Sequence, residues 1–197
     1  MEQEIFFDFC SKLSSSTVLA PPIELQIDDL KLIRGDYRGI NFPVIFKQKE
    51  GKKFCDILDT GYPSLYLISE RMKSLLEENN LTGWKTFPIK LYDKKGNEIA
   101  GYHGFSITGS SGPINYEKSQ IIEKQFVPLG PMVKFYKGFL IDKWDKSDFF
   151  LPEKTTMTCI TKKAAEILRK NKITNMYLEE TADYESDFRI VKKITCN

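Results

Sequence analysis

The chain has 197 residues, of which 41% are hydrophobic and 28% are charged, a composition typical of one globular domain. Its 29 Lys and Arg residues nearly balance its 27 Asp and Glu residues, and the net charge is only +2. The length excludes a multidomain assembly, and the charge balance argues against a strongly charged tail. They also argue against a dominant nucleic-acid surface.

Runs rich in aromatic and apolar residues predict that much of the chain forms strands. Aromatic residues make up 13% of the sequence, and such side chains pack well on pleated surfaces. Apolar runs bounded by turn residues predict strands over 5–9, 23–27, 42–47, 54–58, 65–68, 86–92, 98–102, 104–108, 119–127 and 133–141. Gly96 and Asn97 lie between two of these runs and predict a hairpin turn.

Two segments have the spacing of amphipathic helices. Residues 69–80 begin with a Ser N-cap and place Met72 and Leu76 on one face, and residues 161–172 repeat this pattern behind a Thr N-cap. We therefore expect an α+β fold with mostly antiparallel sheets and two main helices. We expect residues 1–197 to form a single compact domain.

The segments 56–83 and 148–175 resemble each other at a constant offset of 92 residues. Only 5 of the 28 aligned residues are identical, but apolar and capping positions coincide, with Asp56 aligned to Asp148. The pattern predicts two pseudo-repeated β-β-α halves, while chance similarity between two strand and helix units is the alternative.

The four cysteines give no sign of a metal or redox site. Cys10, Cys55, Cys159 and Cys196 include no C-x-x-C pair, and the sequence holds a single histidine, so we expect no metal and no cofactor. The acidic N-terminus lacks the features of a signal peptide, and no apolar run approaches the length that spans a bilayer. We therefore expect reduced thiols, a cytoplasmic protein and no membrane contact.

His103 is the only candidate for a catalytic base. A hydrolase would combine it with Ser106, Cys55 or Cys159, but no recognised nucleophile motif surrounds any of them. A hydrogen-bonded histidine at the end of a hairpin is the simpler interpretation. The segment Gly109–Gly112 could cradle a phosphate, yet it lacks the lysine and helix of a P-loop, so we expect a turn there.

Charge is segregated towards the C-terminal end. The 162–172 helix is basic, which suits either an anionic partner such as nucleic acid or an ordinary solvated face. The following segment is acidic and suits a basic protein partner, and two tryptophans are possible interface anchors that could equally be structural. The candidate contact residues are Glu179, Glu180, Asp183, Glu185, Asp187, Trp84 and Trp144.

One block of sequence resembles a known family. The segment 81–109 contains T-G-W-K, then G-Y-H-G-F-S-I-T-G, and it is followed by W-D-K-S-D-F-F from Trp144. These motifs resemble the immunity proteins of bacterial polymorphic-toxin and related secretion systems, over roughly residues 40–180. The resemblance implies neutralisation of a cognate toxin by tight binding and brings no catalytic residues. The near-neutral charge differs from the acidic character of many inhibitors of nuclease toxins. We therefore expect a binding protein and not an enzyme, with a hydrolase or a nucleic-acid module as the alternatives.

Overall fold

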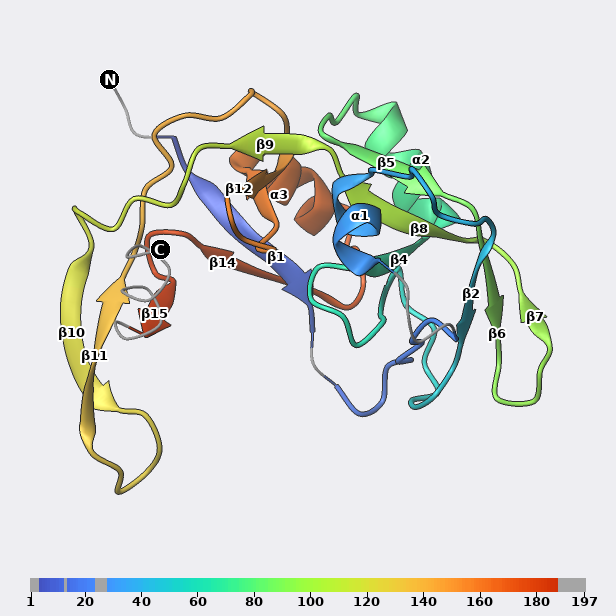
Figure 1. Ribbon diagram of the computed structural model, residues 1–197, viewed down its shortest axis with the longest axis horizontal. Coiled ribbons are helices and arrows are strands. Elements are labelled where there is room, and N and C mark those ends of the chain that lie inside the picture. Colours follow the sequence, from blue (N-terminus) through green and yellow to red (C-terminus); the bar gives the residue numbers. More distant parts are fainter. Residues whose placement is uncertain (1–3, 13, 24–27, 188–197) are drawn as a thin grey trace.

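The computed structural model describes residues 4–12, 14–23 and 28–187, in which the strands form four sheets and three helices are present (Figure 1). The largest sheet has the order β14-β1-β13-β12-β9 and the next has the order β3-β4-β8-β5. The bounds of the first are β1 (Phe6–Ser11), β9 (Gly109–Ser111), β12 (Phe149–Pro152), β13 (Cys159–Thr161) and β14 (Met176–Glu180). Those of the second are β3 (Ile57–Asp59), β4 (Tyr66–Ser69), β5 (Trp84–Phe87) and β8 (Tyr102–Ile107).

Two three-stranded sheets complete the fold. One has the order β2-β6-β7 and the other the order β10-β11-β15. Their strands are β2 (Val44–Lys47), β6 (Ile89–Tyr92), β7 (Glu98–Ile99), β10 (Gln120–Gln125), β11 (Met132–Lys137) and β15 (Glu185–Asp187). Most pairs are antiparallel, and only β9 with β12 and β2 with β6 are parallel. The α+β class predicted from the sequence is confirmed.

The two larger sheets share one hydrophobic core. Phe9 of β1, Phe105 of β8 and Phe149 of β12 are almost fully buried. The Phe149 ring meets the rings of Phe9 and Phe105 edge to face, at centroid distances of 5.8 and 5.6 Å. Such contacts between large apolar rings add to the free energy gained by burial. The division of the chain into domains stays a prediction.

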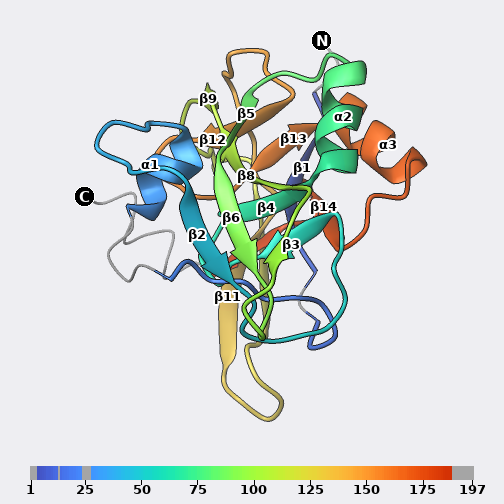
Figure 2. The same ribbon diagram turned by 90° about the vertical axis from the view of Figure 1, so that its right-hand side faces the viewer.

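Both predicted helices are confirmed, together with their N-caps. α2 (Glu70–Glu78) begins after Ser69 and α3 (Lys162–Lys170) begins after Thr161, and each cap hydroxyl accepts the backbone N–H of the third residue along. The two helices lie side by side in Figure 2, and Arg71 near the start of α2 donates to the carbonyl oxygen of Asn171 at the end of α3. A third helix, α1 (Asp29–Arg34), was not predicted because it is shorter than two turns.

Several predicted strand assignments were wrong. The single strand expected over 86–92 is two strands, β5 and β6, because Pro88 cannot donate to a ladder and separates them. The turn expected at Gly109–Gly112 is largely β9, which pairs in parallel with β12. Strands β12 to β15 were not assigned individually. Residues 24–27 of the expected strand 23–27, and Cys196, lie outside the described residues.

The two segments related by the offset of 92 contain the same elements. The ladder order β3-β4-β8-β5 matches β12-β13-β1-β14, with α2 and α3 at equivalent places. Asp56 accepts hydrogen bonds from the backbone N–H and hydroxyl of Thr174, and Asp148 accepts the same two bonds from Thr82. Each segment therefore caps a turn of the other. Whether the halves arose by duplication stays a prediction.

The sheet β10-β11-β15 stands apart from the two larger sheets. Figure 1 shows the β10–β11 hairpin extending away from the rest of the ribbon at the lower left, with β15 against its base. We call this sheet the hairpin module. Among the helices in the described residues, none is both long and apolar enough to cross a membrane.

Candidate partner-binding surface

The five acidic residues predicted as partner contacts lie on two neighbouring strands and the turn between them. Glu179 and Glu180 end β14, where they pair with Asp8 and Phe7 of β1. The other three lie in the turn after β14 or on β15, which pairs with β11 of the hairpin module. The structure thus brings all five to the junction between the largest sheet and the hairpin module.

Asp8 adds a carboxylate that the sequence analysis did not single out. It is half-buried on β1, directly opposite Glu179, so the two acidic side chains share one face of the sheet. Burial, reinforced by the negative charge of Glu179, raises the pKa of Asp8 to about 6. Burial and the neighbouring Asp8 also raise the pKa of Cys10 to about 11. In the sequence, the only indication of this carboxylate site is one acidic residue within a predicted strand of aromatic residues.

The acidic charge nearer the hairpin is balanced by lysines of the hairpin module. Lys137 Nζ lies 3.4 Å from a carboxylate oxygen of Asp183, and Lys124 forms an ion pair with Glu185. Exposed pairs of this kind contribute little to stability, but they cancel charge locally. Among the described residues, Asp8, Glu179 and Glu180 of this junction form no ion pair.

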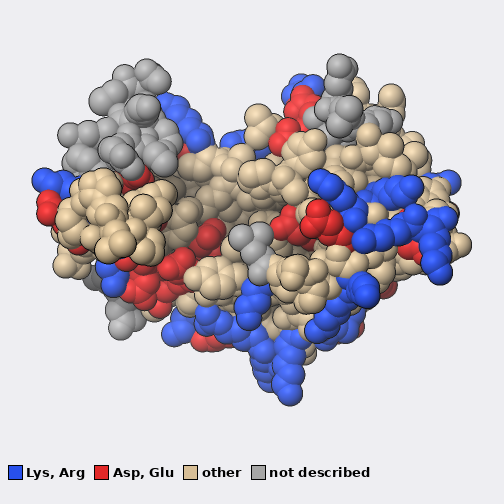
Figure 3. Space-filling model, turned by 90° about the horizontal axis from the view of Figure 1, so that it is seen from below, with Lys and Arg blue, Asp and Glu red and all other residues tan. Residues whose placement is uncertain are grey.

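The tip of the β10–β11 hairpin is an exposed apolar surface. The exposed fraction is 98% for Leu129, 63% for Phe126 and 59% for Met132. Of the eleven large hydrophobic residues that are exposed in the described chain, five fall within residues 121–132. In Figure 3 the tip forms a tan area on the left-hand lobe. Contiguous exposed apolar residues mark interaction sites. Sequence reasoning missed this one because strand patterns imply burial.

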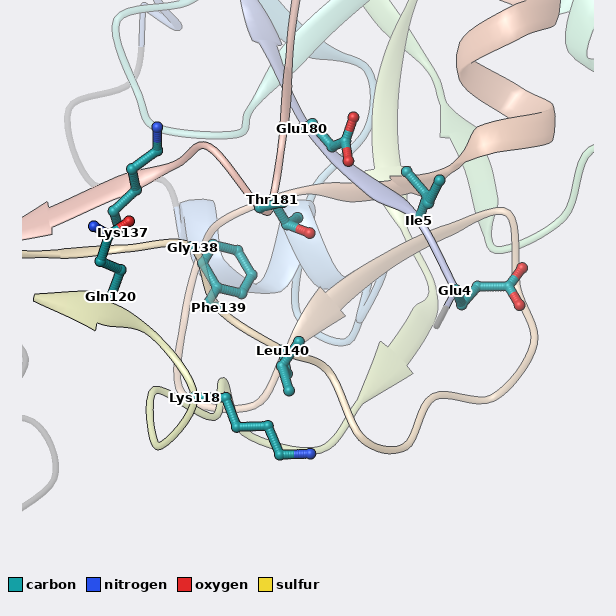
Figure 4. Close-up of a pocket in the computed structure, with 11 residues that line it drawn as sticks. Glu4, Ile5, Lys118, Gln120, Lys137, Gly138, Phe139, Leu140, Glu180 and Thr181 are labelled. Atoms are coloured by element: carbon teal, nitrogen blue, oxygen red, sulfur yellow. The ribbon is translucent and has the colours of Figure 1, made fainter. Parts of the chain in front are cut away.

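A cavity of about 450 Å³ lies where the hairpin module meets β1 and β14. Figure 4 shows Glu4 and Glu180 on the strand side of this cavity, and Lys118 and Lys137 on the hairpin side. Phe139 contributes an apolar wall. The cavity therefore offers both signs of charge next to an aromatic ring, an arrangement suited to a polar protein segment.

The indole N–H groups of the two candidate tryptophans form hydrogen bonds within their own loops. The indole N–H of Trp84 donates to the Leu81 carbonyl at 2.7 Å, and that of Trp144 donates to the Ser147 carbonyl at 3.2 Å. Both rings are half-buried, and Trp144 packs edge to face on Phe6. The structure places neither on the hairpin module. A role for either in binding stays a prediction.

His103 is not assembled with a nucleophile in the described structure. Its Nε2 lies 2.5 Å from a carboxylate oxygen of Glu70 at the start of α2. The buried Ser106 hydroxyl donates to the Leu32 carbonyl at 2.5 Å, and Cys55 and Cys159 are buried. No contact among the described residues joins His103 to any of these three groups. The geometry therefore gives no support to the hydrolase alternative.

Some cationic side chains of the basic 162–172 helix interact with other residues of the same chain. Lys163 Nζ lies 3.4 Å from Asp148, and the guanidinium of Arg169 lies 4.8 Å from the centre of the Phe7 ring. The nucleic-acid alternative therefore has fewer free cations there than the sequence suggested. Across the described residues, no group of three or more His, Cys, Asp or Glu side chains could hold a metal ion.

Comparison with known families identifies the relationship that the sequence motifs suggested. The chain matches the model described as Immunity protein family (Imm11) over residues 13–183, which is most of its length. The resemblance to immunity proteins is therefore confirmed. A comparison with curated proteins found no match.

Proposed function

Because the chain belongs to the Immunity protein family (Imm11), we propose that it neutralises a protein toxin of a bacterial polymorphic-toxin system by binding it directly in the cytoplasm. The match over residues 13–183 carries this proposal. In it the chain catalyses no reaction of its own. A direct inhibitor needs a surface that is already formed and can lose its hydration on contact.

The hairpin tip and the carboxylates at the base of the hairpin form the proposed contact surface. Leu129 and Phe126 supply apolar area, whose burial provides most of the free energy of association. Glu179 and Glu180 would attract a basic face of the toxin, and they speed encounter and set orientation. Asp183, Glu185 and Asp187 flank this surface, and two of them already hold hairpin lysines in place.

Co-expression with the toxin encoded beside the gene tests direct binding. The wild-type chain is expected to restore growth and to co-purify with the toxin. Changing Phe126→Ser together with Leu129→Ser should abolish both, because the apolar contact is lost at two side chains that are 63% and 98% exposed. The matched control is Leu30→Ser, which removes a side chain that is 51% exposed on α1.

Two results would contradict the proposal. Growth rescue without a complex would indicate an enzymatic antidote. Full rescue and co-purification by the Phe126→Ser, Leu129→Ser variant would show that the interface lies elsewhere. Urea denaturation of each variant verifies that its free energy of unfolding is unchanged.

A further inference from the structure

Six lysines gather at the end of β2 and on the loops that follow β2 and β6. They are Lys47, Lys49, Lys52, Lys53, Lys94 and Lys95, all exposed, and we call them the lysine end. In a chain with a net charge of +2, these six cations against the two acids Glu50 and Asp93 within segments 47–53 and 93–97 are a marked local excess. Like charges held together raise the electrostatic free energy of the folded state unless a partner neutralises them.

The ammonium groups of these lysines have no ion-pair partner within the described residues. The hairpin lysines, by contrast, each have one, since Lys124, Lys134 and Lys137 pair with neighbouring acids. None of the six lysines of the lysine end forms an ion pair in the described part of the chain.

The one acid in the loop after β6 is used internally. The carboxylate of Asp93 accepts hydrogen bonds from the backbone N–H groups of Lys95 and Asn97 and from the Asn97 side chain. These hydrogen bonds lower the pKa of Asp93, and the bonds from Asn97 have the largest effect. The carboxylate thus stabilises its own turn and leaves the lysines uncompensated.

Hydrogen bonds hold the lysine-bearing loops in fixed positions. The backbone N–H groups of Lys52 and Lys53 both donate to the Ser16 carbonyl, at 3.0 and 2.9 Å. The side chain of Gln48 donates to Gly51 O at 2.8 Å and accepts from Lys94 N at 3.3 Å, so it joins the two loops. Gly51 has φ +71°, and a Cβ there would lie 1.9 Å from Thr17 O, so only glycine allows this packing.

A groove of about 410 Å³ runs between these loops. Lys52, Lys53 and Lys94 line it together with Ser15 and Ser16. In Figure 3 the blue side chains of this end gather on the right, on the same face of the molecule as the tan hairpin tip. A partner that covers the tip can therefore reach the lysine end across one face.

We propose that the lysine end docks an acidic patch on the partner protein, as a second contact area on the face that carries the hairpin tip. This inference rests on the proposed function for the identity of the partner as a toxin. Charge complementarity to six cations that form no ion pair among the described residues requires carboxylates on that partner. The patch contains no arginine, the residue favoured for bidentate phosphate contacts, and this favours an acidic protein over nucleic acid.

The test compares two triple variants that change the net charge equally. Lys52→Gln, Lys53→Gln and Lys94→Gln neutralise the groove, while Lys143→Gln, Lys154→Gln and Lys170→Gln neutralise three exposed lysines elsewhere. Association of an inactivated toxin that co-purifies with the wild-type chain is measured by surface plasmon resonance at low and high salt. The groove variant should lose about tenfold in association rate at low salt, and the control variant less than about twofold.

A second arm separates failure of this inference from failure of the proposed function. Immobilised poly-L-glutamate should retain the wild-type chain and the control variant but not the groove variant, whether or not a toxin is captured. Equal retention of both variants, or equal association rates with the toxin, would overturn the lysine-end proposal. The wild-type chain could instead bind an oligodeoxythymidine more tightly than it binds the toxin or the polyglutamate. If the groove variant lost that binding, the lysine-end proposal would be overturned in favour of a nucleic-acid partner.

Discussion

Asp8 illustrates how a single side chain gains its properties from distant parts of the chain. In the sequence it is one acid between aromatic residues, and alternation predicts only that it faces away from Phe7 and Phe9. The pairing of β1 with β14 places it opposite Glu179, which lies 171 positions further on. Local reasoning could predict the strand, but the proton affinity of Asp8 depends on that pairing.

Replacing Asp8 should stabilise the protein at neutral pH. Its pKa is about 6 in the folded state against 3.8 unperturbed, so the folded state binds the proton more tightly. The resulting stabilisation is complete below pH 3.8 and is lost as the pH rises through about 6. Asp8→Asn should therefore raise the free energy of unfolding above pH 7 by roughly 2 kcal/mol.

Urea denaturation at several pH values measures this effect. The difference between Asp8→Asn and wild type should shrink as the pH falls towards 4. Glu153→Gln, at an exposed position, is the control and should follow the wild-type curve. A constant difference at every pH would show that the effect comes from packing and not from ionisation.

At the scale of elements, local signals predicted the helices well and the sheets less well. Ser69 and Thr161 were recognised as N-caps because a cap needs only its own next three residues. β9 was missed, since a Gly-Ser run has low strand propensity and is held there by parallel pairing with β12. At Gly109 a Cβ would lie 2.2 Å from Phe149 O, so this close pairing requires glycine for a tertiary reason.

The reciprocal contacts between the two β-β-α units should contribute strongly to stability. Burial alone would raise the pKa of Asp56, but hydrogen bonds from Arg71, Thr174 and Ser69 outweigh it and lower the pKa to about 2. Asp56→Asn should lower the free energy of unfolding at pH 7 by about 2 kcal/mol, since charge-assisted bonds to Arg71 and Thr174 are lost.

The pH dependence of this prediction has the opposite sign from that of Asp8. The stabilisation by Asp56 is complete above pH 3.8 and is lost as the pH falls towards about 2. Thermal unfolding of wild type and Asp56→Asn should therefore converge in acid. The control is Asp36→Asn, which breaks an exposed ion pair with Arg38. This variant should unfold at the same temperature as the wild type.

For the whole molecule, a net charge of +2 conceals two surfaces of opposite sign. The balance of charge in the sequence gave no information about how charge is distributed in space. The carboxylates of Asp8, Glu179 and Glu180, which form no ion pair among the described residues, come from strands at the two ends of the sequence. The lysine end comes from segments between them. The exposure of the hairpin tip was equally hidden, because Phe126 and Val127 end an apolar run for which the sequence predicted a strand.

The two charged surfaces should act independently on the rate of toxin binding. Neutralising Glu179 and Glu180 to Gln, or Lys52, Lys53 and Lys94 to Gln, should each slow association at low salt. Because the two sets of residues share no contacts, the fold reduction in association rate of the combined variant should equal the product of the two separate fold reductions. The association rate of the combined variant should also depend least on salt. If the toxin instead presented a single sign of charge, one set of substitutions would speed association while the other slowed it. Stopped-flow association rates at increasing ionic strength distinguish the two cases. Only for a toxin that carries both signs of charge should each of the two variants associate more slowly than the wild-type chain.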